Sequence, residues 1–166
     1  LHGAAHHGPQ EFQVVIPRRA TRPVQAGNVL IRFHGKGPFG HSQTQEIKTP
    51  TGILNASTPE TTAWDLVRYF KAAGGLENVA TVLSELAERL DGSKLRHTLK
   101  QHGEIIVAQR LGYLLDKLGR RKLSDGLVDL VKKSTLRPLD PTAPLAGASE
   151  SRKWNLLINV QVEPEA

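Results

Sequence analysis

The sequence predicts an α+β fold, in which a small mixed sheet packs against a bundle of about five helices. Three features indicate it. Turn-separated β-branched segments fill the first third of the chain, helical apolar periodicity fills the middle, and an alternating apolar segment closes the chain. A length of 166 residues is typical of one domain. We therefore expect residues 1–166 to form a single domain, whose sheet combines the N-terminal strands with the C-terminal strand.

The first third of the chain is predicted to form strands. Phe12–Ile16 is rich in β-branched residues, and Val29–Phe33 alternates between apolar and polar positions after a Gly-Asn turn. A basic connection, Arg18–Pro23, separates these two segments. Glu46–Thr49 and Gly52–Asn55 flank a turn that contains proline and glycine, and we expect them to form a hairpin.

A helix start signal follows these strands. Ser57 can accept a hydrogen bond from the Glu60 amide while the Glu60 carboxylate reaches back, and Pro59 suits a first helical turn. We expect this helix to end at Gly74-Gly75. Four more helices are predicted from apolar residues at three- and four-residue spacing. They run from Leu76 to Leu90, from Ser93 to about Gln101, from Val107 to Leu118 with Gly119 as the C-cap, and from Leu123 to Val131.

The end of the chain is predicted as a surface connection and one long strand. Residues 137–151 carry three prolines and no long apolar run, which is typical of a connection. Trp154–Val162 alternates, with its apolar side chains on one face. Because that face must be buried, we expect this strand to pair with the N-terminal strands.

Composition limits the class of partner and the compartment. A net charge of +6 and a pI near 9.8 favour an acidic partner, either nucleic acid or an acidic protein face. The chain has no cysteine, no membrane-length apolar run and no signal peptide, so we expect a cytoplasmic protein without membrane association. The chain starts at Leu1 and contains no methionine, so we expect upstream sequence to be missing.

Two patterns raise the question of catalysis or metal binding. Glu46-Ile47-Lys48 has the Glu-x-Lys form of metal-dependent nuclease strands, but such sites need a second carboxylate on the preceding strand, and no Asp precedes Asp65. His2, His6 and His7 could share a metal, but glycines weaken a helix there and no carboxylate is near. We expect no enzyme activity, no cofactor and no metal, with a degenerate nuclease using Glu46 and Lys48 as the alternative.

Clustered basic residues are the better candidates for a binding surface. Phosphate contacts need grouped guanidinium and ammonium groups. The candidates are Arg18, Arg19, Arg22, Lys117, Arg120, Arg121, Lys122, Lys132 and Lys133, with Arg137 close to the last two. The lysines near predicted helix C-termini have a structural alternative, since they also complement the helix dipole. The low aromatic content of 5% offers no stacking platform for single-stranded nucleic acid.

Several segments together resemble the C-terminal domain of AbiEi-type antitoxins. These segments are Leu1–Ala4 leading to Phe12–Val15, Ser57–Tyr69, Gly75–Ala80, Gln109–Asp116 and the closing Trp154–Glu163 strand. The family belongs to bacterial type IV toxin–antitoxin systems of abortive infection, a form of phage defence. The resemblance implies an N-terminal winged-helix domain that this chain lacks.

The resemblance also implies function. Members repress their own operon by binding promoter DNA, and the C-terminal domain opposes a nucleotidyltransferase-like toxin, either directly or only functionally. The basic surface would then assist DNA binding. Arg68, Arg110, Asp65 and Tyr113 are the polar members of the matching motifs. For Arg110 a binding role and a structural role, such as an ion pair with Asp65, both remain open.

Overall fold

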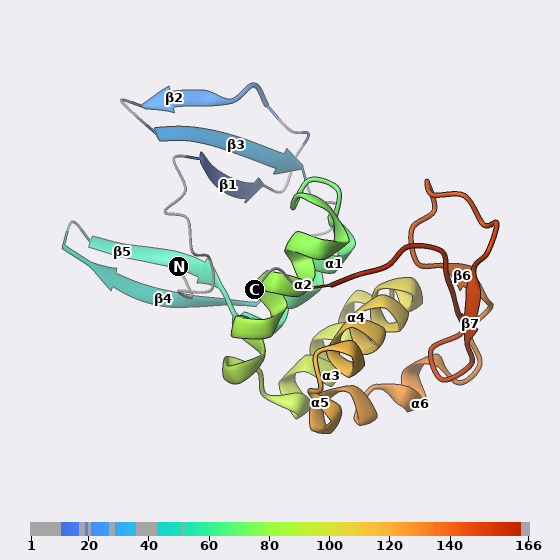
Figure 1. Cartoon of the computed structure of the whole chain (residues 1–166). Coiled ribbons are helices and arrows are strands. Elements are labelled where there is room, and N and C mark those ends of the chain that lie inside the picture. The colour runs from blue at the N-terminus through green and yellow to red at the C-terminus, as the bar shows by residue number, and fades with distance from the viewer. Residues whose placement is uncertain are drawn as a thin grey trace. The chain divides into compact units, whose positions relative to one another are not determined.

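The computed structural model describes residues 11–16, 19, 21–26, 29–35, 43–50 and 52–163. Strands come first, helices occupy the middle, and short strands return at the end (Figure 1). The elements are β1 (Glu11–Ile16), β2 (Val24–Ala26), β3 (Val29–Gly35), β4 (Thr44–Thr49), β5 (Gly52–Ser57), α1 (Pro59–Arg68), α2 (Gly75–Leu86), η2 (Ala87–Arg89, a 3₁₀ helix), α3 (Gly92–His102), α4 (Ile105–Lys117), α5 (Arg121–Asp125), α6 (Val128–Val131), β6 (Arg137–Pro138), β7 (Ser149–Ser151) and β8 (Leu156–Ile158). The predicted α+β class is confirmed.

The chain divides into two compact units. β1, β2 and β3 belong to the unit of residues 5–42, called here the first unit, and the elements from residue 43 onward belong to the second unit. They form a sheet of order β1-β3-β2, in which β1 runs parallel and β2 antiparallel to β3. β1 and β3 correspond to predicted strands. β2 was not predicted, because a strand of three residues is too short for its periodicity to be recognised.

The second unit begins with the predicted hairpin. β4 and β5 pair antiparallel from Thr44 opposite Ser57 to Thr49 opposite Gly52, and Gly52 has a φ of 145° that suits glycine alone. The Thr49 hydroxyl donates to the Gly52 carbonyl at 3.0 Å across the turn. The turn signal in the sequence therefore located this hairpin correctly.

Helix α1 begins one residue later than predicted. Thr58 is the N-cap, and its hydroxyl accepts a hydrogen bond from the Thr61 amide at 3.2 Å. Ser57 is the last residue of β5, so its backbone is committed to the hairpin. The predicted reciprocal bond is also absent, because the buried Glu60 carboxylate accepts from the Asp91 amide at 3.0 Å. Glu60 thus ties the start of α1 to the loop before α3.

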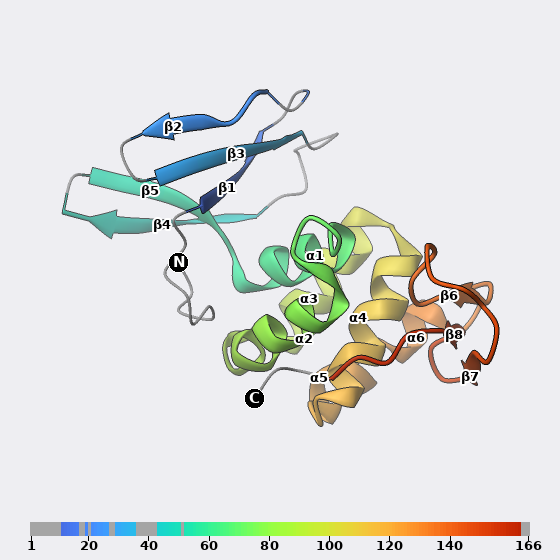
Figure 2. The ribbon, with the colours of Figure 1, turned by 45° about the horizontal axis from the view of Figure 1, so that its top comes forward.

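The middle helices follow the predicted stripes. α1 ends at Arg68, earlier than the predicted end at Gly74-Gly75, and turns occupy residues 69–74. Gly74 and Gly75, with φ values of 86° and 95°, mark the start of α2. α3 starts after the N-cap Asp91, and α4 is followed by Gly119 in the left-handed region. α4 is the central helix of this unit, since it contacts α1, α2, α3, α5 and α6 (Figure 2).

The last predicted helix is divided in two. We expected one helix from Leu123 to Val131, but a turn at Gly126 separates α5 from α6. Glycine disfavours a helix interior, and the Gly126 carbonyl accepts a hydrogen bond from Arg96 of α3 at 2.5 Å. The break does not change which side chains are buried, since Leu127 and Val131 of the predicted apolar stripe are both fully buried.

The prediction for the C-terminal strand was wrong in length and partner. β8 covers only Leu156–Ile158 and pairs parallel with β6 and antiparallel with β7, so it forms its own sheet instead of joining the N-terminal strands. Asn155 stops the strand at one end because its φ of 50° lies in the left-handed region. At the other end, the Asn159 side chain donates to the carbonyls of Asp140 and Ala143.

The segment predicted as a surface connection contributes to this sheet. Residues 137–151 include β6 and β7, and Leu139 is fully buried. Pro138 fits in β6 because the ladder there uses the amides of its neighbours, Arg137 to Asn155 and Leu139 to Leu157. The strand was not predicted because three prolines indicate a loop and β6, with two residues, is too short to show a strand pattern.

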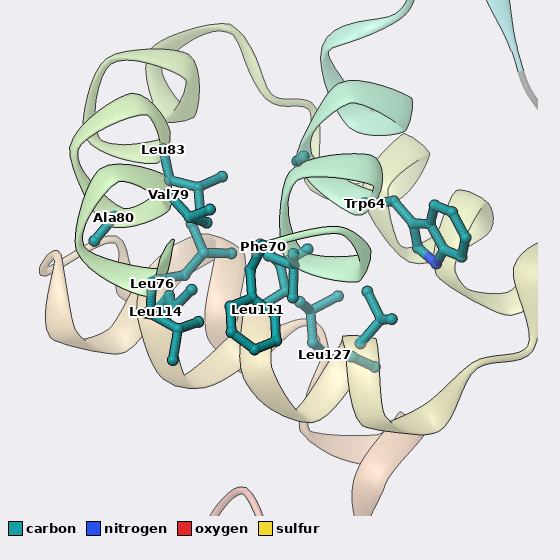
Figure 3. Close-up of a cluster of buried hydrophobic side chains, with 14 of the residues drawn as sticks. Trp64, Phe70, Leu76, Val79, Ala80, Leu83, Leu111, Leu114 and Leu127 are labelled. Carbon is teal, nitrogen blue, oxygen red and sulfur yellow. The ribbon is translucent and has the colours of Figure 1, made fainter. Parts of the chain in front are cut away.

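The hydrophobic core of the second unit lies between the helices. Figure 3 shows Phe70, Leu76 and Val79 gathered with Leu111 and Leu114 of α4. Trp154, Leu156 and Val162 of the C-terminal segment belong to the same core. The apolar face predicted for the closing strand is therefore buried, but against helices and not on an N-terminal sheet.

Candidate functional site

The middle of α4 presents polar side chains to the C-terminal segment. Gln109 is only 1% exposed. Its side-chain nitrogen Nε2 donates to the carbonyls of Thr135 at 3.0 Å, Trp154 at 3.1 Å and Asn155 at 2.8 Å. One buried side chain therefore satisfies backbone carbonyls on two separate stretches of chain. Sequence reasoning did not single out Gln109, because a lone glutamine in an apolar helix carries no recognisable signal.

Arg110 lies beside it and is also buried. Its Nε donates to the Leu139 carbonyl at 2.9 Å, and its guanidinium carbon lies 5.3 Å from the centre of the Phe70 ring. Burial lowers the pKa of Arg110, and the carboxylate of Asp140 opposes that shift. The hydrogen bonds of Arg110 thus go to the backbone of the C-terminal segment and not to Asp65.

Further along α4, Gly112 and Asp116 contact Trp154 of the C-terminal segment. An added Cβ on Gly112 would stand 2.1 Å from the indole ring, so only glycine leaves room for it. The Asp116 carboxylate accepts from the indole nitrogen at 2.9 Å, from Ser124 at 2.5 Å and from Lys153 at 2.8 Å. Burial acts to raise the pKa of Asp116, but these hydrogen bonds outweigh it and the pKa is lowered.

A groove lies where this helix meets the C-terminal segment. Its volume is about 480 Å³, and one wall is formed by Ile105, Ile106, Gln109 and Arg110 of α4. The facing wall consists of Lys133, Ser134, Thr135, Arg137, Pro138 and Pro141. The groove therefore combines apolar side chains with three cationic ones, and no carboxylate lines it.

The predicted basic residues differ in how far their charge is used inside the protein. Arg120 donates to the Ser84 carbonyl at 3.1 Å and lies 3.3 Å from Glu88. Lys132 pairs with Asp129 at 2.5 Å. By contrast Arg121 and Lys122 are exposed at the start of α5, and neither forms an ion pair with any described residue.

The other candidates are spread over the chain. Arg68 pairs with Glu104, at 2.6 Å between nitrogen and oxygen, on the surface between α1 and α4. Lys117 is exposed in the last turn of α4. Arg19 and Arg22 are exposed in the first unit, whereas Arg18 lies outside the described residues.

The comparison with protein families found one match. The family described as AbiEi antitoxin C-terminal domain matches residues 1–117. The chain belongs to this family. The predicted family is thereby confirmed, and membership gives the chain an antitoxin role in a toxin–antitoxin system, with a toxin as partner. No curated protein and no solved structure matches the chain.

The match to the AbiEi family ends at the last residue of α4. The closing strand, which contributed to the predicted resemblance, lies outside it. The side chains of Gln109, Arg110 and Asp116 lie inside the matched region, and they bind the segment that follows it. In this antitoxin domain, α4 is therefore the element that attaches the C-terminal segment.

The hairpin places no carboxylate opposite either residue of the nuclease alternative. Glu46 lies opposite Asn55 and Lys48 lies opposite Ile53, so neither faces an acidic residue across the hairpin. Among the described residues, no group of three or more His, Asp or Glu side chains is arranged to hold a metal ion. His2, His6 and His7 lie outside the described residues. No helix in the described part of the chain has both the length and the apolar character needed to cross a bilayer.

Proposed function

We propose that this antitoxin domain opposes a nucleotidyltransferase-like toxin in a type IV toxin–antitoxin system that defends bacteria against phage. Membership of the AbiEi family over residues 1–117 is the observation that carries this proposal. The family indicates a regulatory role and not an enzymatic one. The opposition to the toxin is either direct contact or an effect on the same cellular target.

A co-expression experiment tests this part of the proposal. The chain is expressed in a bacterium together with the nucleotidyltransferase-like toxin proposed as its partner, and growth is compared with expression of the toxin alone. Restored growth is the expected result, and co-purification of the two proteins then separates direct contact from a functional effect. If the chain is stably folded and growth is not restored, this domain does not supply the antitoxin activity.

We also propose that the basic surface assists an N-terminal winged helix in binding promoter DNA for autorepression. The exposed cations that support this are Arg19, Arg22, Lys117, Arg121 and Lys122. Arg121 and Lys122 are the best placed of them, because they are adjacent and form no ion pair with a described residue. Arg120 is less available, since its guanidinium group already binds Ser84 and Glu88.

Charge reversal tests the DNA contact. In the protein with its preceding segment, Arg121→Glu with Lys122→Glu should weaken promoter binding and reduce the slope of log affinity against log salt concentration. The control is Lys94→Glu with Lys100→Glu, which reverses two exposed charges on α3 and so changes the net charge by the same amount as the α5 variant. An equal loss in both variants would mean that only the total charge matters, and an unchanged slope would remove α5 from the DNA face.

A further inference from the structure

The groove between α4 and the C-terminal segment has the chemistry of a peptide-binding site. We propose that it binds an acidic protein segment that also carries an apolar side chain. This inference goes beyond the DNA contact proposed above, because it concerns a groove and another class of partner. Its volume of about 480 Å³ lies within the range of about 300–1,000 Å³ that is usual for ligand sites.

The apolar part of the groove is available to a partner. Ile105 is 47% exposed although it begins the central helix, and Ile106, Pro138 and Pro141 line the groove with it. These four side chains share one groove, and apolar surface that is grouped and bordered by polar residues is typical of a protein contact. Duplex DNA is recognised through phosphates and base edges and would make little use of these side chains.

The charge of the groove selects an acidic partner. Lys133 and Arg137 are exposed on the facing wall, and neither forms an ion pair with a described residue. Glu104 and Asp140, which are sequence neighbours of the lining residues Ile105 and Pro141, do not pair with Lys133 or Arg137. Glu104 pairs with Arg68, and Asp140 accepts hydrogen bonds from Thr142. Opposite charges across an interface speed association and exclude wrong partners. A second copy of this chain is disfavoured, since each copy carries a net charge of +6.

The walls of the groove are held in a fixed relation. Gln109 binds the Thr135 carbonyl and Arg110 binds the Leu139 carbonyl, so hydrogen bonds join α4 to the facing wall on both sides of Arg137. A groove that is already formed binds a peptide without the cost of ordering its own walls. The groove is therefore built by the same side chains that attach the C-terminal segment.

Selection from a random peptide library displayed on phage tests this proposal even though the natural partner is unidentified. The full chain is the bait, and the same library is selected on Lys133→Glu with Arg137→Glu. We expect wild-type selection to enrich peptides that carry aspartate or glutamate together with an apolar residue. Selection without an acidic preference, or no enrichment at all, would overturn the proposal.

The enriched peptide is then synthesised, and its binding is measured by fluorescence polarisation. Reversal of Lys133 and Arg137 should weaken binding by roughly tenfold or more, and Ile105→Ser should weaken it as well. Lys94→Glu with Lys100→Glu is the matched control and should leave binding unchanged. Circular dichroism shows whether each variant is folded. Equal weakening of peptide binding by the control variant would assign the binding to general charge attraction. If promoter DNA displaces the peptide, and the Lys133 and Arg137 variant also binds that DNA more weakly, the groove would be assigned to DNA.

Discussion

The indole of Trp154 lies directly against the backbone of Gly112. A Cβ at position 112 would stand 2.1 Å from the nearest ring carbon, a distance that no side chain atom can occupy. The ring is also held at its other side, because its nitrogen donates to Asp116 one turn further along α4 at 2.9 Å. A glycine in the middle of a helix, normally a destabilising choice, is thus required here by packing.

Gly112→Ala should destabilise the chain by about 3 kcal/mol, because the added methyl group must displace a fully packed indole. Urea unfolding followed by tryptophan fluorescence measures the change in the free energy of unfolding. Gly92→Ala is the matched control. A Cβ at Gly92 would meet Leu123 at 3.7 Å, which is ordinary contact, so this variant should be neutral or slightly more stable. Equal losses in both variants would contradict the packing argument.

Asp116→Asn should reduce stability near neutral pH by about 1–3 kcal/mol, because the ion pair with Lys153 is lost. Since the folded state lowers the pKa of Asp116, its contribution is complete above the pKa of the unfolded chain and is lost as the pH falls through the folded pKa. The difference between wild type and variant should therefore shrink in acid. Thermal unfolding across an acidic pH series measures it, and a difference that stays constant with pH would contradict this role.

Gln109→Leu should loosen the C-terminal segment, because it removes the donor to the Thr135 carbonyl and leaves the buried Trp154 carbonyl without that partner. We expect a loss of about 1–3 kcal/mol and faster amide exchange over residues 135–155, measured by hydrogen–deuterium exchange. Gln101→Leu changes an exposed glutamine at the end of α3 and should leave exchange in this region unaltered. Unchanged exchange in the Gln109 variant would show that packing alone holds the segment.

Glu46→Ala should leave both toxin opposition and DNA binding intact, because Glu46 is exposed on the hairpin and lies opposite Asn55. Growth rescue and promoter affinity are the measurements, with the unchanged chain as reference. A metal-dependent cleavage of DNA by the wild type that disappears in this variant would instead revive the nuclease alternative.

The sequence predicted most elements because their signals are local. The helix stripes and the hairpin turn each depend on neighbouring residues, and the structure places them as expected, although α1 ends at Arg68 and not at Gly74-Gly75. The predictions failed where the signal was short or involved distant partners. β2 and β6 are too short to show a period, and the bond from Arg96 to the Gly126 carbonyl, which accompanies the break between α5 and α6, joins residues 30 positions apart.

The candidate site was predictable only in its charges. Clustered Lys and Arg residues are visible in a sequence, but whether a charge is available depends on its partners. Arg120 and Arg121 are adjacent, yet only the first binds Ser84 and Glu88. The groove was not predictable, because its walls come from α4 and from a segment that the sequence indicated as a connection.

The sequence by itself determined the α+β class, most of the helices, the basic character and the family, since all of these reside in composition, local periodicity and motif order. Only the tertiary structure decided what the closing strand pairs with, and it paired Leu156–Ile158 with β6 and β7. The physical reason is that an apolar strand needs burial but does not specify its neighbour. The position of the closing strand follows from contacts with α4. Gln109 and Asp116 form hydrogen bonds with Trp154, and Gly112 leaves room for its indole ring.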